Sequence, residues 1–360
     1  MQEKIIREIY DKNLNEKIRL KRTDKGNIIF TTVKMGERMK EIKCMQKPMF
    51  AHIRLTSKCN LKCPYCYTDD NRLTKDMSFD EVKQVIDLCN KNGIMNITWT
   101  GGEPLLRKNF DELIRKTNSY GINQTILTNG LLLNNLFNIP NENITFQISL
   151  NNVWEQSQDI EIIIQNAKKM VEKKFTVIMS VMLKDVKICF IQELLDKLVE
   201  NHIPGIRFGL EIPVGGLKEK NMAAYENNII DMAGELFELR KQYENKIKIF
   251  YQFDKSQYID TGFPRRFFMC EAGTTQIYID NNGDVYPCPL FKSYKEFYCG
   301  NVFNDSWEEL WNSPPMMEFR SVEECANCEY NCSVWCRAFV YGKDKSLNAF
   351  SPFCLKQIKN

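Results

Sequence analysis

Between residue 48 and about residue 215, the pattern of apolar and polar positions alternates between two periods. The intervening stretches repeat apolar residues every three or four positions, which is typical of amphipathic helices. The shorter runs are rich in β-branched and aromatic residues, as buried strands are, and they are FAHIRLT (50–56), NITWTG (96–101), INQTILTNG (122–130), ITFQISL (144–150), FTVIMSVML (175–183) and GIRFGLEIP (205–213). Six β–α units in succession predict a parallel sheet, in an open α/β fold or a partial barrel.

The clearest predicted helix covers residues 78–93. Ser78 and Glu81 have the spacing of a capping box, in which each side chain accepts a hydrogen bond from the other residue's backbone N–H. Gly93 ends the pattern, as glycine commonly ends helices. Between them lies an apolar stripe at helical spacing, formed by Val82, Val85, Ile86 and Cys89. The segments IIIQNAKKMVEKK and IQELLDKLVEN repeat this helical pattern.

The character of the chain changes after about residue 247. The strand-like runs IKIFYQF and TQIYID, a turn at DNNGD and a high density of cysteine replace the regular alternation. Such a region cannot bury a large core, so we expect bound metal to supply part of its folding free energy. We predict an N-terminal extension at 1–47, an α/β domain at 48–247 and a small cysteine-rich domain at 248–360. The extension has a charged, helix-like start and two short strand-like runs, with no candidate chemistry.

The composition is that of a globular chain able to bury a core, with 43% hydrophobic and 26% charged residues among 360. The net charge is +3 and no dense cluster of Lys and Arg is present, so neither nucleic acid nor a membrane surface is an expected partner. The chain has no apolar run of the roughly 18 residues that span a bilayer, and the polar start MQEKIIREIYDKN is not a signal peptide. The expected location is the cytoplasm.

The chain contains fourteen cysteines and only two histidines, His52 and His202. In a reducing compartment, so many cysteines are expected to hold metal rather than to form disulfides. The scarcity of histidine excludes a His-rich zinc site and favours iron bound by thiolates.

Three cysteines lie within eight positions in the stretch SKCNLKCPYCYTDD, at Cys59, Cys63 and Cys66. Three thiolates from one loop can hold three corners of a [4Fe–4S] cube and leave the fourth iron open to another ligand, which makes the centre a site of reaction. Two simpler interpretations stay open on the spacing alone. The thiols can complete a zinc site with a distant cysteine, or they can be reduced cysteines with no ligand role.

This loop and the strand ends that follow it resemble the radical SAM enzymes. CNLKCPYC fits the CxxxCxxC motif of that family, with the aromatic Tyr65 before the last cysteine. TGGEP matches the family's GGEP motif at the end of the second predicted strand, and TNG and ISLN resemble its third and fourth strand ends. The resemblance runs over roughly residues 48–215. It implies a partial (β/α)6 barrel of the TIM type, a [4Fe–4S] cluster and S-adenosylmethionine as cofactor.

The resemblance also implies cofactor contacts at particular positions. Glu103 would accept the methionine ammonium, the Gly101–Gly102 backbone would approach closely, and Tyr65 would contact the adenine. One electron from the cluster would cleave the sulfonium to give a 5′-deoxyadenosyl radical that abstracts a substrate hydrogen.

Three further positions are implied less directly. Ser149 would lie near the ribose, and Asn151 stands where relatives often carry Asp. Arg207 shares a strand face with Gly209 and would reach the cofactor carboxylate, or else form a surface salt bridge.

The C-terminal cysteines resemble the SPASM domain, which extends radical SAM enzymes and holds two auxiliary clusters. Cys270 is followed by twelve residues and then by GDVYPC, which fits the C…GxxxxC opening of that domain, and GNVFNDSWEELWNSP resembles its linker with Asp305 or Ser306 as helix cap. CANCEYNCSVWC has cysteine spacings of two, three and three, whereas the family has two, five and three.

By position, the resemblance implies two sets of ligands. One auxiliary cluster would use Cys325, Cys328, Cys332 and Cys354. The other would use Cys270, Cys288 and Cys336. Cys299 would be the fourth ligand of the second set, or that cluster would keep an open coordination site that can bind a substrate thiolate. A third alternative is a smaller electron-relay cluster such as [2Fe–2S].

Proteins that combine these two domains mostly modify peptides. The favoured interpretation is therefore an enzyme that forms a thioether or carbon–carbon cross-link in a ribosomally made precursor peptide. Sulfatase maturation is disfavoured, because those enzymes carry an Asp that acts as a base immediately after the cysteine of GxxxxC, and Pro289 stands at that position here. The expected partners are the peptide and a reductant such as flavodoxin or ferredoxin. Because only about fifty residues precede Cys59, too few for a complete leader-recognition domain, recognition of the peptide would need a separate leader-recognition protein or a different surface of this chain.

Three alternatives stay open. Within the same family, the chain can be a tetrapyrrole-modifying or other small-molecule radical SAM enzyme. From other classes, it can be a non-catalytic iron–sulfur electron carrier or a zinc-stabilised binding module. TGGEP disfavours the carrier, because a carrier has no need to hold an amino-acid ammonium beside an open iron.

Overall fold

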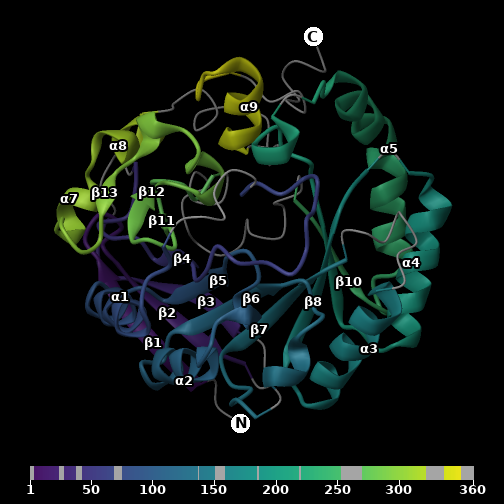
Figure 1. Cartoon of the computed structure of the whole chain (residues 1–360), viewed down its shortest axis with the longest axis horizontal. Helices are drawn as coiled ribbons and strands as arrows, with labels where there is room; N and C mark the ends of the chain where they lie inside the picture. Colours follow the sequence, from purple (N-terminus) through teal and green to yellow (C-terminus); the bar gives the residue numbers. More distant parts are fainter. Residues whose placement is uncertain are drawn as a thin grey trace.

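The structure is a computed structural model that describes most of the chain. The described residues are 4–23, 28–37, 43–68, 75–136, 138–150, 159–184, 186–218, 220–252, 270–321 and 336–349. Figure 1 shows a strongly curved sheet whose outer face is covered by helices, with the C-terminal elements at one end of that sheet.

The centre of the fold is a ten-stranded sheet in the order β10-β9-β8-β7-β6-β5-β4-β11-β12-β13. Seven parallel strands form its first part: β4 (Phe50–Arg54), β5 (Asn96–Thr100), β6 (Asn123–Thr128), β7 (Ile144–Ser149), β8 (Thr176–Met182), β9 (Gly205–Gly209) and β10 (Lys248–Tyr251). All six predicted strands are therefore confirmed, and IKIFYQF adds β10 as a parallel neighbour of β9. The α/β class with an incomplete barrel is confirmed as well.

Helices connect the parallel strands along the outer face (Figure 1). They are α1 (Phe79–Lys91), α2 (Phe110–Ser119), α3 (Asp159–Glu172), α4 (Ile188–Glu200) and α5 (Ala223–Gln242), with short 3-10 turns at Pro104–Leu106, Leu133–Leu136 and Gly215–Leu217. The predicted capping box of α1 is present: Ser78 accepts from the Glu81 N–H, and Glu81 accepts from the Ser78 N–H. Its predicted apolar stripe is buried.

The cysteine-rich part continues the same sheet. β11 (Gln276–Ile279) pairs in parallel with β4, and the hairpin goes on through β12 (Asp284–Tyr286) and β13 (Gly300–Asn301). Short helices follow: α7 (Trp307–Trp311), α8 (Pro314–Arg320), α9 (Arg337–Asp344), and 3-10 turns at Pro289–Phe291 and Lys295–Phe297. Ser306 caps α7 through a capping box with Glu309, as predicted.

Two hydrophobic clusters bear on the site. The main core is continuous from the barrel helices to Ile277, Trp307 and Trp311 beyond β10. A smaller cluster is built around Phe291, whose ring lies 4.6 Å from Phe297 by centroids, and Cys270, Cys288 and Cys336 pack against it. Burial of apolar surface therefore holds the two parts of the chain together.

The N-terminal segment differs from its predicted helix-like start. β1 (Lys4–Asp11), β2 (Glu16–Arg22) and β3 (Ile28–Lys34) form a separate antiparallel sheet. A register shift between Ile5 and Arg7 interrupts the strand alternation of β1, so the apolar spacing imitates a helix. Arg7 of β1 donates hydrogen bonds to the Asn90 and Tyr120 carbonyls, which attaches this sheet to α1 and α2.

Across the described ranges, the structure contains no helix that is both long enough and apolar enough to cross a membrane.

Candidate cofactor site

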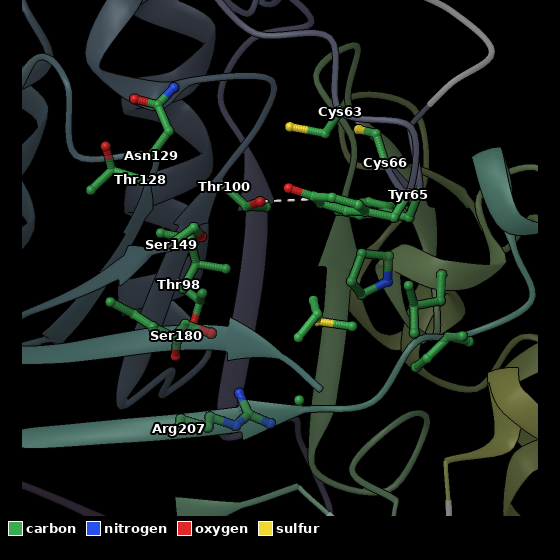
Figure 2. A pocket seen from close by; sticks show the side chains of 18 of the residues that line it. Cys63, Tyr65, Cys66, Thr98, Thr100, Thr128, Asn129, Ser149, Ser180 and Arg207 are labelled. Carbon is green, nitrogen blue, oxygen red and sulfur yellow. Dashed lines mark hydrogen bonds between the residues drawn. The ribbon is translucent and has the colours of Figure 1, made fainter. Parts of the chain in front are cut away.

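A cavity of about 770 Å³ opens where the parallel strands end. Its wall is built from strand residues of the barrel, from the loop after β4 and from the cysteine-rich domain (Figure 2). Ligands of open α/β sheets and barrels bind at this edge, because the loops that carry function follow the carboxyl ends of the strands. A volume of this size accommodates a small molecule or the side chains of a peptide.

Cys59, Cys63 and Cys66 all line this cavity. The turn that holds them is compact: the Cys66 N–H donates to the Cys63 carbonyl at 3.2 Å, and the Leu61 N–H lies 3.4 Å from the Cys59 sulfur. Burial raises the pKa of the Cys59 thiol. Three thiols on one short loop at the wall of a cavity are the donor set that an iron–sulfur cube requires, because each thiolate of such a cube binds its own iron.

The glycines of TGGEP lie against the cysteine loop. The Gly102 N–H donates to the Thr56 carbonyl, and the Glu103 N–H donates to the Lys58 carbonyl, both at 2.8 Å. A Cβ at Gly101 would lie 2.8 Å from the Thr56 oxygen, and one at Gly102 only 2.2 Å from the Lys58 oxygen. Glycine is therefore required here because the two backbones touch.

Sequence reasoning missed a second glycine contact, made by the segment VGGL after β9. Gly215 has φ of +56°, and a Cβ there would lie 2.5 Å from the Cys66 carbonyl oxygen. At Gly216 a Cβ would lie 2.1 Å from the Pro64 oxygen, while its N–H donates to Cys66 at 3.0 Å. The consecutive glycines of VGGL were the sequence feature that could have indicated this close backbone contact. These contacts hold the last cysteine of the loop from the far side of the barrel.

Glu103 is buried, with 1% of its surface exposed, and it lines the cavity. One carboxylate oxygen accepts from the Leu105 N–H and the Thr128 hydroxyl, and the other accepts from the Asn129 N–H. A carboxylate offers about four acceptor positions, so one position is left for a donor in the cavity. Burial raises the Glu103 pKa, and these hydrogen bonds oppose that rise.

The cysteine loop is closed at its base by residues from three segments. Asp76 accepts from the Thr56 hydroxyl at 2.6 Å and from the Ser57 N–H at 2.8 Å, so it joins the two ends of the loop. Asn281, in the turn between β11 and β12, donates to Asp76 at 2.9 Å and accepts from Arg54 at 3.0 Å. The turn of the cysteine-rich domain therefore holds the base of the first cysteine loop.

Arg54 and Asp280 form a buried ion pair beside this contact, at 3.2 Å. The Arg54 side chain has no exposed surface, and Tyr278 donates a hydrogen bond to Asp280 at 2.8 Å. Sequence reasoning singled out neither residue, because their partners lie 226 positions apart.

The other predicted cofactor contacts fall into two groups. Tyr65, Ser149 and Arg207 line the same cavity as the three cysteines, and the Lys184 ammonium lies 5.8 Å from the centre of the Tyr65 ring. Asn151 lies outside the described residues. Within the described residues Arg207 forms no ion pair or hydrogen bond, so the alternative of a surface salt bridge has no partner in that part of the chain.

The predicted auxiliary ligands are also divided by what the structure describes. Cys270, Cys288 and Cys336 line the cavity, and the Cys288 pKa is raised well above its usual value, chiefly by burial and also by the other two sulfurs. Cys299 is not among the cavity residues; its sulfur lies 3.5 Å from the Phe297 carbonyl, and burial raises its pKa to about 12. The remaining predicted ligands, Cys325, Cys328, Cys332 and Cys354, lie outside the described residues.

The other cysteines and histidines have distinct environments. Cys89 is fully buried on the α1 stripe, Cys44 is half-buried against the core, and Cys189 is exposed. His202 has φ of +57° just after α4, and its backbone N–H donates to the Val199 carbonyl, so it ends the helix. His52 on β4, by contrast, lines the cavity, which sequence reasoning did not anticipate.

Comparison with known proteins agrees with this site. The family model of the Radical SAM superfamily matches residues 53–198, and that of the SPASM iron-sulfur cluster-binding domain matches residues 270–333. The chain is similar to the antilisterial bacteriocin subtilosin biosynthesis protein AlbA of Bacillus subtilis, with 25% identity over 74% of this chain and 60% of AlbA. It is also similar to the sporulation killing factor maturation protein SkfB of the same organism, with 23% identity over 78% of this chain and 68% of SkfB.

A solved structure shares the fold. Streptococcus suis SuiB, bound to its precursor peptide SuiA, has a TM-score of 0.68 and 20% identity, covering 85% of this chain and 75% of SuiB. The chain thus has both matched domains in sequence order, and it spans 60% of the length of AlbA. The chain therefore contains a radical SAM domain at residues 53–198 followed by a SPASM iron–sulfur cluster-binding domain at residues 270–333, and these two domains imply a [4Fe–4S] cluster, S-adenosylmethionine and auxiliary iron–sulfur clusters as cofactors.

Proposed function

We propose that this enzyme modifies a ribosomally made precursor peptide by forming a thioether or carbon–carbon cross-link. The observation that carries the proposal is one cavity lined both by Cys59, Cys63 and Cys66 and by Cys270, Cys288 and Cys336. A substrate in that cavity lies between the two cysteine sets. The relatives support a peptide, because AlbA is named for bacteriocin biosynthesis, SkfB for maturation of a sporulation killing factor, and SuiB is bound to a precursor peptide.

We place the cofactors on the residues that fit them. Cys59, Cys63 and Cys66 would hold the first cluster, and Glu103 would accept the ammonium of S-adenosylmethionine at its remaining acceptor position. Tyr65 would contact the adenine, and Ser149 and Asn151 the ribose. When bound, this cofactor supplies the carbon radical that takes a hydrogen atom from the substrate. The protein holds the substrate hydrogen in reach and keeps water away.

We assign the auxiliary clusters by the same reasoning. Cys270, Cys288 and Cys336 would hold the cluster that faces the cavity, and Cys325, Cys328, Cys332 and Cys354 would hold the other. The position of Cys299 away from the cavity supports an open coordination position on the first of these. A substrate thiolate would fit that position, which favours thioether formation.

The partners follow from this chemistry. The enzyme would need a low-potential reductant such as flavodoxin or ferredoxin, and it would work in the cytoplasm, where thiols stay reduced. A separate leader-recognition protein would present the peptide.

The test is cofactor cleavage by anaerobically reconstituted protein supplied with a strong reductant. We expect 5′-deoxyadenosine to form, and to be lost in Cys63→Ala. With a small precursor peptide encoded beside this gene, we expect the product to lose two hydrogen atoms in its mass spectrum. If 5′-deoxyadenosine forms while the mass of every such peptide stays unchanged, the result contradicts the peptide proposal and favours a small-molecule substrate. Fully loaded protein that never cleaves the cofactor contradicts the enzymatic role.

A further inference from the structure

Arg207 is the one lysine or arginine among the described residues that line the cavity. It lies on β9, and Figure 2 shows its guanidinium directed into the cavity. In the described ranges, no ion pair or hydrogen bond is formed by this side chain. The Arg207 side chain is half-buried, and a half-buried guanidinium without an anion is partly desolvated with no compensating charge, so the site is prepared for a negatively charged ligand.

The strand register places further polar groups beside Arg207. Ser149, Ser180 and Arg207 are cross-strand neighbours on β7, β8 and β9, and all three line the cavity. Gln147 donates to the Ser180 hydroxyl at 3.3 Å, which leaves that hydroxyl free to donate its own proton. A row of donors next to a guanidinium is the surface that a carboxylate requires.

His52 contributes to the same space from the opposite wall, on β4. Burial and, to a smaller extent, the positive charge of Arg207 together lower the His52 pKa to about 4. The ring is therefore neutral at neutral pH and offers one N–H donor. His52 and Arg207 thus line one cavity from β4 and β9, and both can donate hydrogen bonds to a ligand in it.

Three carboxylates line the cavity, those of Glu103, Asp159 and Glu271, and within the described residues none of them forms an ion pair with Arg207. Glu103 has three hydrogen-bond donors of its own at the other end of the cavity. The described residues therefore leave the charge of Arg207 to a ligand.

We propose that Arg207 and His52 form a subsite for a carboxylate of the substrate, an acidic side chain or the C-terminal carboxylate of the peptide. This deepens the proposed function and rests on it. The subsite would decide which part of the peptide enters the barrel, because only a residue near a carboxylate would be held there.

The cofactor also carries a carboxylate, which was the sequence-based expectation for Arg207. That carboxylate would lie at the open iron, beside the three-cysteine loop. Figure 2 shows Cys63 and Cys66 at one side of the cavity and Arg207 at the other, with Thr98 and Ser180 between them. The geometry therefore points to the substrate as the source of the anion.

The first experiment needs no turnover and no identified peptide. Reconstituted enzyme is treated with phenylglyoxal, which modifies arginine, and labelling of Arg207 is followed by mass spectrometry. The probes are N-acetyl-glutamate methylamide, its glutamine counterpart and S-adenosylmethionine. We expect the glutamate probe to slow labelling several-fold and the glutamine probe to have no effect. If S-adenosylmethionine alone protects Arg207 from labelling, Arg207 binds the cofactor and the proposal is wrong. If none of the three probes protects Arg207, no carboxylate subsite exists there.

The second experiment separates the two ligands by affinity. In Arg207→Met, binding of S-adenosylmethionine should stay within about twofold of the wild type, whereas the KM of a processed peptide should rise about ten- to a hundredfold. Replacing the peptide carboxylate by an amide should raise the wild-type KM equally and leave that of the variant unchanged. Arg115→Met, on α2 where Arg115 donates to the Asn138 carbonyl, is the matched control. A fall in cofactor affinity alone contradicts the proposal.

These outcomes are distinguishable from failure of the proposed function. Labelling and cofactor affinity do not depend on cross-linking, so a correct subsite can stand beside an unmodified peptide. Conversely, if the peptide is cross-linked and its KM is the same for the wild type and Arg207→Met, the result contradicts only the subsite and leaves the proposed function intact.

Discussion

The backbone at Gly102 is in direct contact with the backbone of the cysteine loop at Lys58, so a shift of either segment would displace the other. Its would-be Cβ meets a backbone carbonyl rather than a flexible side chain. Glu103, the next residue, is buried and bonded on both oxygens. At the scale of single residues, the site depends on close backbone approach and on one buried charge.

We expect Gly102→Ala to displace the cysteine loop. A Cβ at 2.2 Å from the Lys58 oxygen forces a backbone shift, so the free energy of unfolding should fall by about 1–3 kcal/mol. The iron content after reconstitution, followed by visible absorbance, should fall with it. Gly234→Ala is the control, because nothing lies within 4 Å of a Cβ there and alanine favours the α5 helix. Normal iron loading in Gly102→Ala would contradict the close-approach argument.

We expect Glu103→Gln to weaken binding of S-adenosylmethionine about ten- to a hundredfold, because a charge-assisted hydrogen bond is replaced by a neutral one. Since burial raises the Glu103 pKa, wild-type affinity should fall on acidification as the carboxylate protonates. The variant should lack that component of the pH dependence. Equilibrium binding across a pH series measures both effects. Glu81→Gln, at the exposed start of α1, should bind as the wild type does.

At the scale of elements, the turn between β11 and β12 supports the loop after β4. Asn281 bonds to Asp76 and Arg54 through its side chain and accepts from the Met77 N–H through its carbonyl at 2.6 Å. The VGGL segment contacts the same loop from the other side. The first cluster site is therefore assembled from three elements that are far apart in the sequence.

We expect Asn281→Ala to destabilise the protein by about 1–3 kcal/mol, because it leaves buried partners of its amide without hydrogen bonds. The affinity for S-adenosylmethionine should also fall, because the loop after β4 that carries the three cysteines becomes less ordered. Asn282→Ala is the neighbouring control, since Asn282 bonds only to Asp284 and to Asn301 among the described residues. Chemical denaturation and cofactor binding measure the two effects. Equal behaviour of both variants would argue that the turn does not support the loop.

At the scale of the whole molecule, one sheet and one hydrophobic core run through both the radical SAM domain and the SPASM domain. β11 pairs with β4, and the core reaches from the barrel to Trp307 and Trp311. The boundary that composition predicts near residue 247 stays a prediction, although β10 continues the barrel sheet past it. We expect the barrel and the β11–β12 hairpin to unfold as one unit.

Asp280→Ala tests this coupling. It leaves Arg54 buried without its anion, which should cost about 3–5 kcal/mol of unfolding free energy. Hydrogen exchange should show protection lost in β4 and β11 together. Asp80→Ala removes an exposed ion pair with Lys83 and should cost at most about 1 kcal/mol. Loss of protection confined to the hairpin would mean that the two parts unfold independently.

Local patterns account for what the sequence predicted well. All six strands, the capping box at Ser78 and the helix cap at Ser306 depend on residues near each other in the chain. The N-terminal strand β1 was misread because its register shift is set by pairing with β2. His52 was overlooked because nothing in its neighbours says which side of β4 faces the cavity.

By itself, the sequence determined the family, the cofactors and the parallel barrel, since motif spacing and hydrophobic period are carried by contiguous residues. Only the tertiary structure decided that β11 extends the barrel sheet, that Asn281 and Asp280 hold the base of the cysteine loop, and that Arg207 and His52 line the same cavity. These contacts join residues whose separation in the chain has no periodic signature. They arise from strand pairing and burial, which act on the folded chain as a whole.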